Sequence, residues 1–300
     1  MHSTKPRTAL LAAPLLAATV LTGCAAHPQP APRPGPPVAA PVADPFHQLE
    51  QRFGARLGVY VLDTGSGREI THHADERFAF ASTSKALAAG ALLRRASDAD
   101  LEKVVTYRQA DVLTWAPVTS KHVDTGMTLR DLLAASLDHS DNTAANLVTA
   151  EVGGPAAVQQ ALRDLGDITT HVDRTEPTLN ETAPGDTRDT STPRALAADL
   201  RQYVLGDVLP ADRRRLLTDL MLANTTGGPY IRAGVPAGWK VADRTGNADH
   251  GTRNDIAVAW PGGGRSPVVI VVLSDRARPD AASDDELIAR ATEAALNALG

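Results

Sequence analysis

A serine and a lysine stand three residues apart in the run FAFASTSK, which spans residues 78–85. If Ser82 begins a helix, both side chains lie on one face of that helix, and the amine of Lys85 can reach the hydroxyl. A base beside a hydroxyl is the arrangement that covalent catalysis needs, and the unpaired N–H groups at a helix start can receive an oxyanion. The alternative is that Ser82 caps the helix and that Lys85 is solvated.

Three further polar motifs follow along the chain. Residues 140–142 read Ser-Asp-Asn, which forms either a helix cap or part of a site, because all three side chains readily bond their own backbone. Glu176 lies in a Pro-flanked loop between Arg174 and Asn180, where it is either a surface partner of Arg174 or a functional carboxylate. Residues 244–246 read Arg-Thr-Gly and form either a turn or a second part of the same site.

The order and the spacing of these motifs resemble the class A serine β-lactamases, which use Ser-x-x-Lys, Ser-Asp-Asn and Lys-Thr-Gly. The resemblance extends through PVTSKHVDTGMTLRDLLAASLDHSDNTAAN, PGDTRDTSTP and PAGWKVADRTG, and it covers the chain from about Phe46 onward. It implies hydrolysis of the β-lactam amide of penicillins through a serine acyl-enzyme, which confers antibiotic resistance. The resemblance implies no cofactor and no metal.

The resemblance also implies catalytic roles for four residues. Ser82 would be the nucleophile that opens the ring, and Lys85 would assist by moving its proton. Ser140 would relay that proton to the ring nitrogen as it leaves. Glu176, oriented by Asn180, would activate the water that releases the ester. Whether Lys85 or Glu176 is the base for acylation is left open by the sequence.

Other positions would bind the substrate by the same resemblance. Asn142 would bond the side-chain amide, and the backbone N–H groups of Ser82 and Asn247 would hold the oxyanion. Trp115 aligns with an aromatic that walls the site, although it is alternatively a packed surface ring. Arg253 aligns with a second arginine for the substrate carboxylate, or is an exposed arginine at a strand end. The expected substrate-binding set is Asn142, Asn180, Arg244, Thr245, Gly246, Asn247, Arg253 and Trp115.

Arg244 is the main departure from the family pattern, which usually has lysine at this position. The carbenicillinase subset is described by an arginine there. An arginine presents a planar fork with two donors instead of a point charge, so the substitution changes the substrate geometry. We therefore expect a preference for penicillins over extended cephalosporins.

The elements that must position these groups follow from hydrophobic patterning. A short helix is expected from Phe46 to Phe53, two strands at 57–62 and 68–72, and mostly helical structure from 82 to about 222. Strand patterns return at 238–243, 255–260 and 267–273, before a last helix at 284–299. The expected fold class is α/β, with an antiparallel sheet built from both ends of the chain (about 44–75 and 225–300) and an inserted helical part (about 76–224).

The first 43 residues have the composition of an export and anchoring segment. Residues 1–24 carry basic residues, an apolar run and then Leu-Thr-Gly-Cys, which resembles the bacterial lipobox. Lipidation of Cys24 would anchor the exported protein to the cell membrane, whereas the alternative is plain secretion. The Pro- and Ala-rich residues 25–43 predict an extended tether before the catalytic domain at 44–300.

Composition and histidine spacing argue against several other classes of function. A net charge of −5 and an aromatic content of 4% do not favour nucleic-acid binding. The nine histidines form no zinc-hydrolase motif, and His72-His73 is interpreted as a strand end in water. We expect a monomer. The alternatives that stay open are a penicillin-binding D-Ala-D-Ala peptidase, which lacks the loop that bears Glu176, and a lipid-tethered sensor that remains acylated.

Overall fold

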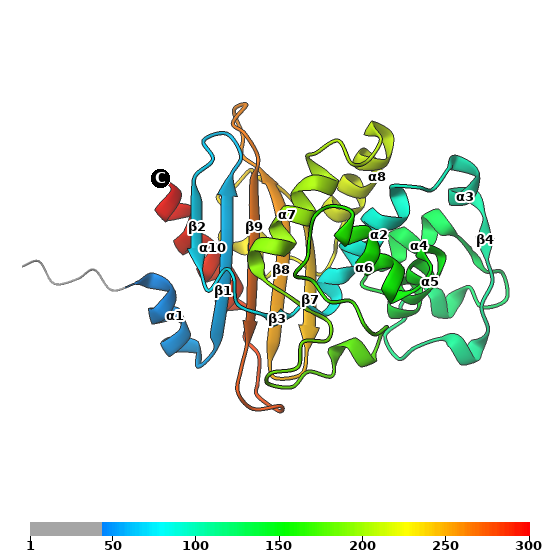
Figure 1. The fold of residues 1–300 in the computed structure, drawn as a ribbon, viewed down its shortest axis with the longest axis horizontal. Coiled ribbons are helices and arrows are strands. Elements are labelled where there is room, and N and C mark those ends of the chain that lie inside the picture. Colours follow the sequence, from blue (N-terminus) through cyan, green and yellow to red (C-terminus); the bar gives the residue numbers. More distant parts are fainter. Residues whose placement is uncertain (1–43) are drawn as a thin grey trace, which may run out of the picture. The chain divides into compact units, whose positions relative to one another are not determined.

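One five-stranded antiparallel sheet joins the two ends of the chain in the computed structural model, which describes residues 44–300 (Figure 1). The strand order is β2-β1-β9-β8-β7, so the N-terminal hairpin pairs with the C-terminal strands through β1 and β9. This arrangement confirms the expected fold class. The strands are β1 Arg56–Asp63, β2 Glu69–His72, β7 Lys240–Ala248, β8 Thr252–Trp260 and β9 Val268–Asp275.

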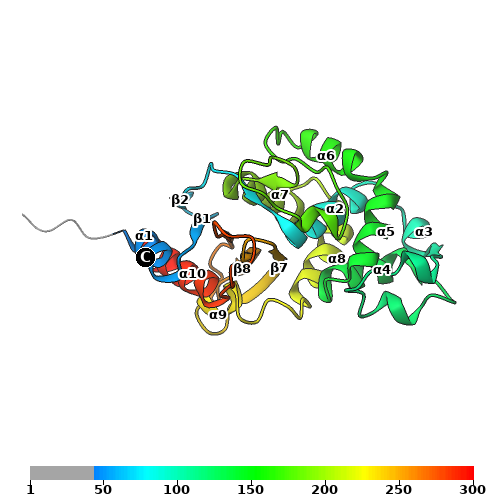
Figure 2. The ribbon, with the colours of Figure 1, turned by 90° about the horizontal axis from the view of Figure 1, so that it is seen from below.

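Both faces of the sheet are covered along its central strands, which explains why β1 and β9 are apolar almost throughout. Successive side chains of a strand point to opposite faces. Leu57, Val59 and Val61 therefore pack with the terminal helices α1 (Pro45–Phe53) and α10 (Glu286–Leu299), whereas Tyr60 and Leu62 join the core on the other face. Figure 2 shows α10 on one side of the sheet and α7 (Pro193–Val204) on the other.

Helix α2 (Ser84–Leu93) lies at the centre of the helical layer, and all ten of its residues are buried. A helix enclosed on every side has no polar face, which accounts for the unbroken apolar pattern after Lys85. The helices around it are α4 Leu129–Asp138, α5 Asn142–Val152, α6 Pro155–Arg163, α7 and α8 Ala211–Leu222.

Shorter elements complete the described residues. Two small antiparallel pairs, β3 with β6 and β4 with β5, connect distant loops. The bounds are α3 Asp98–Glu102, α9 Ile231–Gly234, β3 Phe78–Ala79, β4 Val104–Val105, β5 Met127–Thr128 and β6 Thr190–Ser191, with 3₁₀ turns at Ala81–Thr83, Gln109–Asp111, Thr119–Lys121 and Thr178–Asn180.

Two features of the fold differ from the sequence-based expectation. Strand β7 continues to Ala248 because it pairs with β8 along its whole length, so residues 244–246 are strand and not a turn. Helix α7 lies within 76–224, the segment expected to form the helical part, yet it packs on β9, β8 and β1. An amphipathic helix is drawn to the sheet because that face would otherwise be exposed apolar surface.

The expected signal, lipidation and tether segments at residues 1–43 lie outside the described residues. Within residues 44–300, every helix is too short or too polar to cross a bilayer.

Candidate active site

Ser82 lies in the 3₁₀ turn Ala81–Thr83, which leads directly into helix α2. Strand β7 passes so close to this turn that a Cβ atom on Gly246 would lie 2.8 Å from the carbonyl oxygen of Phe80 and 3.1 Å from the backbone nitrogen of Ser82. Only glycine allows that approach without displacing backbone atoms. The approach brings the backbone of Ser82 beside the end of β7, where Asn247 follows Gly246.

The carboxylate of Glu176 is the centre of the polar contacts around Ser82. Its Oε1 accepts a hydrogen bond from Ser82 Oγ at 2.8 Å and lies 3.0 Å from Lys85 Nζ, while Oε2 accepts from Asn180 Nδ2 at 2.6 Å. The side chain of Glu176 is only 1% exposed. The alternative that Glu176 is a surface carboxylate is therefore wrong, and so is the alternative that Lys85 is solvated, since its side chain is 2% exposed.

Arg174 pairs with a different carboxylate. Its Nε donates to Asp189 Oδ2 at 2.6 Å, and Asp189 Oδ1 also accepts from the backbone N–H groups of Asp173 and Arg174. Because Asp189 is fully buried, this pair closes the base of the loop that carries Glu176. A buried pair with several hydrogen bonds holds its geometry better than an exposed pair.

Asn146 holds the backbone of Glu176 and was not identified from the sequence. Its Oδ1 accepts from the N–H of Glu176 at 2.9 Å, and its Nδ2 donates to the carbonyl oxygen of Glu176 at 2.8 Å. One signal in the sequence could have found it. Asn142 and Asn146 are four residues apart on helix α5, so both amides lie on the face that meets the site.

Lys85 connects the loop of Glu176 to the Ser-Asp-Asn segment. Besides its contact with Glu176, Nζ donates to the carbonyl oxygen of Ser140 at 3.0 Å, to Ser140 Oγ at 3.1 Å and to Asn142 Oδ1 at 2.6 Å. Burial lowers the pKa of Lys85 to about 8, since the ammonium loses its water, although the carboxylate of Glu176 acts in the opposite direction.

Asp141 performs the capping role that the sequence left open for this segment. It is the N-cap of helix α5 and accepts from the N–H of Ala144 at 2.9 Å and from Thr119. The cap fixes the turn at Ser140, whose φ of 58° is left-handed. Capping by Asp141 therefore points the flanking side chains of Ser140 and Asn142 toward Lys85.

Arg244 is completely buried in the middle of β7. Its guanidinium donates to Ser140 Oγ and, at 3.3 Å, to Thr245 Oγ1. Burial lowers the pKa of Arg244 to about 10, while Glu176 and Asp243 favour the charged form. The side chain therefore remains a cation at neutral pH, and it contacts Ser140 directly.

The remaining expected binding residues surround this centre. Trp115 is 57% exposed. Its backbone carbonyl accepts from the N–H of Asn142, and its ring Nε1 donates to the carbonyl oxygen of His139 at 3.3 Å, so the ring lies beside the Ser-Asp-Asn segment. Arg253 is opposite Asn247 in the ladder of β7 and β8. Its Nε donates to Asp285 Oδ1 at 2.8 Å, so the guanidinium is already paired within the chain.

Tyr230 and Asp285 contact the expected binding residues Asn247 and Arg253 and were not identified from the sequence. The hydroxyl of Tyr230 donates to Asn247 Oδ1 at 3.0 Å, and burial raises the pKa of Tyr230 above its ordinary value. Thr226 similarly shares a hydrogen bond of 2.6 Å with Thr245 Oγ1. These contacts fix the side chains at the end of β7, and no pattern in the sequence links residues so far apart.

The groups around Ser82 form a chain of contacts: the carboxylate of Glu176 contacts Ser82 and Lys85, and Lys85 and Arg244 both contact the hydroxyl of Ser140. A nucleophile in contact with a base that a third group orients is the arrangement of covalent acyl transfer.

The chain is similar to proteins of one family. The family model described as "Beta-lactamase enzyme family" matches residues 41–299. A β-lactamase of Bacillus licheniformis is 53% identical over 256 residues, which are 85% of this chain and 83% of that protein. The crystal structure of a halotolerant bacterial β-lactamase matches with a TM-score of 0.84 and 50% identity over 86% of this chain and 99% of that chain. A class A β-lactamase from Mycobacterium abscessus matches with a TM-score of 0.82 and 48% identity over 85% and 98%.

Asn146→Ala tests whether the backbone clamp on Glu176 matters for turnover. The substitution leaves the N–H and the carbonyl of Glu176 without their partner, and a small displacement of a catalytic group can cost about 10²-fold in rate. We expect kcat for a penicillin to fall by about 10- to 100-fold and the acyl-enzyme to become detectable by mass spectrometry. Asn297→Ala, at an exposed asparagine of α10, should leave kcat unchanged. An unaltered kcat in Asn146→Ala would show that the clamp is dispensable.

Proposed function

The chain belongs to the class A β-lactamases and hydrolyses β-lactam antibiotics, and we propose that it does so through an ester on Ser82 that Glu176 helps both to form and to release. The observation that carries the proposal is the hydrogen bond of 2.8 Å from Ser82 Oγ to the buried carboxylate of Glu176. A base within hydrogen-bond reach of the proton that it removes is the first requirement of general base catalysis.

In the first step, Glu176 takes the proton from Ser82 Oγ while that oxygen bonds to the carbonyl carbon of the lactam. The developing oxyanion is held by the backbone N–H groups of Ser82 and Asn247, and one such donor is typically worth about 10²–10³ in rate. The C–N bond of the ring then breaks as Ser140 gives its hydroxyl proton to the nitrogen. Lys85 contacts both Ser140 and Glu176. Its ammonium gives a proton to Ser140 and takes back the proton that Glu176 received from Ser82.

In the second step, the ester on Ser82 is hydrolysed. Once Oγ is part of the ester, it has no proton to donate, so Glu176 Oε1 becomes available to a water molecule. Asn180 keeps the other carboxylate oxygen in place at 2.6 Å. Glu176 removes a proton from the water, which attacks the ester carbon, and Ser82 leaves with that proton. The buried Glu176 therefore favours repeated hydrolysis, whereas a sensor or a peptidase would form a persistent acyl adduct.

Substrate preference is proposed to follow from the cations at the end of β7. Arg244 has no exposed surface, so we infer that it acts on a substrate carboxylate through its charge and through the hydroxyl of Thr245, which it contacts. Arg253 is the more accessible cation, with 23% of its side chain exposed beside Asp285. The preference for penicillins over extended cephalosporins stays a prediction.

We further propose that the enzyme is exported, lipidated on Cys24 and held at the cell membrane as a monomer. Support comes from the apolar run and the Leu-Thr-Gly-Cys sequence at residues 21–24, followed by a Pro- and Ala-rich stretch that ends where helix α1 begins. A single lipid chain binds membranes weakly, whereas the two or more chains of a bacterial lipoprotein make a durable anchor.

The two catalytic assignments can be tested separately with purified enzyme. Ser82→Ala removes the nucleophile and should abolish both the covalent adduct and turnover, measured by mass spectrometry and by loss of β-lactam absorbance. Glu176→Ala should lower kcat by at least about 10²-fold and let the acyl-enzyme accumulate, because ester hydrolysis loses its base. Rapid turnover in Glu176→Ala, with no adduct, would remove Glu176 from its role.

The pH dependence distinguishes the two candidate bases for acylation. If Glu176 is the base, Lys85 works as an ammonium ion, and kcat/KM should fall as the pH rises through about 8, where Lys85 loses its proton. If neutral Lys85 is the base, kcat/KM should rise through the same pH range. We expect the fall, because three of the four contacts of Nζ are to oxygens that can only accept, and the fourth is to the hydroxyl of Ser140. Stopped-flow acylation rates between pH 6 and about 9.5 give the answer.

Cys24→Ala tests the membrane anchor. We expect the variant to move from the membrane fraction to the soluble fraction or the medium, because the thioether that carries the lipid cannot form. Fractionation and immunoblotting measure the change, and Ser3→Ala provides a control within the same segment. A variant that stays in the membrane fraction would argue against lipidation at this residue.

A further inference from the structure

Two histidines and a glutamate lie together far from Ser82, where helix α1 meets the end of strand β2. Glu50, His72 and His73 each offer one ligand atom, and these atoms all lie within 4.8 Å of one another. The sequence-based interpretation of His72-His73 as a strand end in water is wrong for His72, whose side chain is only 10% exposed. His73 fits that interpretation better, with 36% of its side chain exposed.

The spacing of the three groups is close to that of a metal site. His72 Nε2 lies 3.4 Å from Glu50 Oε1, and His73 Nε2 lies 3.7 Å from the same oxygen. Zinc binds histidine nitrogen and carboxylate oxygen at about 2.0–2.2 Å, which separates tetrahedral ligand atoms by roughly 3.3 Å. A contraction of at most about 1.5 Å between any two of the ligand atoms would therefore bring all three to bonding distance.

The backbone and the burial of the two histidines favour a ligand. Neighbouring residues of a strand point to opposite faces, but His73, which follows the strand, has a left-handed φ of 45°, and the centroids of the two histidine rings lie 4.1 Å apart. Such a conformation is costly for a residue other than glycine and occurs often at functional sites. Nε2 of His72 is buried and has no hydrogen-bond partner, although a buried polar atom normally has one.

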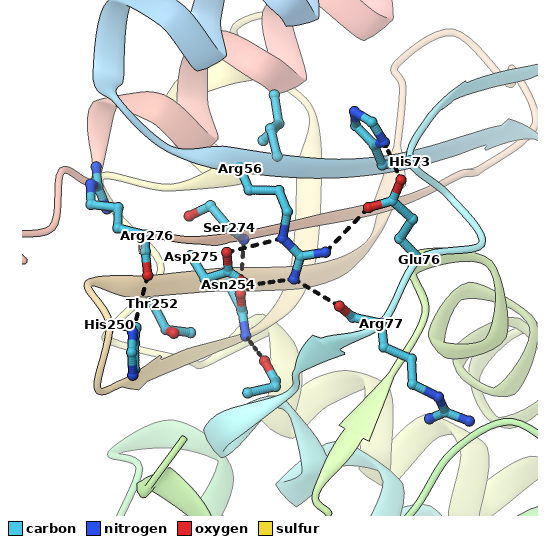
Figure 3. A network of polar contacts seen from close by, with 12 residues as sticks. Arg56, His73, Glu76, Arg77, His250, Thr252, Asn254, Ser274, Asp275 and Arg276 are labelled. Carbon is cyan, nitrogen blue, oxygen red and sulfur yellow. Dashed lines mark hydrogen bonds and ion pairs between the residues drawn. The ribbon is translucent and has the colours of Figure 1, made fainter. Parts of the chain in front are cut away.

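The second nitrogen of each ring faces a carboxylate. His73 Nδ1 lies 2.6 Å from Glu76 Oε1, and Arg56 donates to the other oxygen of Glu76 at 3.2 Å, so that carboxylate is itself held in place (Figure 3). His72 Nδ1 lies 3.6 Å from Asp44 Oδ2. Histidines that bind metals usually donate their other N–H to a carboxylate, which fixes the tautomer and turns Nε2 toward the metal.

We propose that Glu50, His72 and His73 bind one divalent transition-metal ion of the zinc type. Two imidazoles and a carboxylate are a ligand set that zinc accepts, with the fourth position left to water or to His47. His47 Nδ1 lies 3.5 Å from the second oxygen of Glu50; its side chain is exposed, and its Nε2 contacts Gln51 Nε2 at 3.0 Å, a bond that binding the metal would replace. The ion would link the first helix of the catalytic domain to the edge of the sheet.

This site is structural and not catalytic, because it lies at the opposite edge of the sheet from Ser82. His72 ends β2, whereas the turn of Ser82 packs against β7, and three other strands lie between these two. Adjacent strands are about 4.8 Å apart, so the two sites are separated by roughly 19 Å across the sheet. Hydrolysis should therefore be independent of the metal.

The test is a zinc titration of the full chain, purified without a histidine tag and stripped with a chelator. Competition with a chromogenic chelator at pH 7.5 should give one zinc ion per chain. At a free concentration about 100 times Kd, zinc should raise Tm by about 5–10 °C, since it binds the folded state alone. The initial rate of penicillin hydrolysis should not change.

Matched variants separate a built site from general binding. His73→Asn keeps a residue that tolerates left-handed φ and should abolish both the binding and the rise in Tm. His122→Asn, at an exposed histidine elsewhere, should bind like the parent. Glu76→Gln should weaken binding by about 10-fold or more through the orientation of His73.

Two results would overturn the proposal. If the parent binds less than one zinc ion per chain, Glu50, His72 and His73 form only an ion-paired contact between α1 and the end of β2, and they do not form a metal site. If His73→Asn and His72→Gln bind zinc as tightly as the parent, the bound metal lies elsewhere on the chain. In either case the hydrolysis of β-lactams and the roles of Ser82 and Glu176 would be unaffected, because those rest on the other edge of the sheet.

Discussion

The buried carboxylate of Glu176 is the interaction on which the rest of the site depends. Lys85 and Arg244 are both withdrawn from water, and each raises the cost of the other's charge. Burying a charge costs several kcal/mol, which a well-placed opposite charge offsets only with good geometry and full hydrogen bonding. Glu176 supplies that negative charge within 3.0 Å of Lys85, and the same oxygen receives the hydroxyl of Ser82. The charges are thus stable as a set, and the set is also the catalytic arrangement.

Much of the surrounding structure can be understood as the means of holding that carboxylate in place. Glu176 is 94 residues from Ser82 along the chain and lies in a loop, where backbone order is harder to maintain than in a helix. Asn146 binds both backbone groups of Glu176, Asn180 binds its carboxylate, and the pair of Arg174 with Asp189 closes the loop. Helix α2 is buried on every side, so the turn of Ser82 cannot move away. Turnover requires this precision because the ester must meet both a base and a water molecule.

The sheet separates two polar centres with different demands. At the edge formed by β7, Gly246 admits the turn of Ser82 and the strand end carries Thr245 and Asn247. At the other edge, β2 ends at His72, and His73 follows it beside Glu50 of helix α1. The three strands between them are largely buried and closely packed, so a change at one edge has little means of reaching the other. Catalysis and the attachment of α1 can therefore vary independently.

Hydrophobic periodicity predicted the strands at both ends of the chain, the last helix and hence the antiparallel sheet. Burial of a strand or helix face requires apolar residues at regular intervals, and these intervals can be read directly from the sequence. The spacing of Ser82 and Lys85 and the motif at 140–142 each left a bland alternative open, and the chemistry was predicted from the resemblance that the four motifs carry jointly. Only the tertiary structure decided that Glu176 faces Ser82 and not Arg174, and that β7 runs through residues 244–246. It also showed that Asn146, Tyr230 and Asp285 hold the predicted residues Glu176, Asn247 and Arg253 in place. These outcomes depend on contacts between residues far apart in sequence and on strand pairing. The same holds for His72 and His73, since a left-handed φ at one residue leaves no mark in the composition.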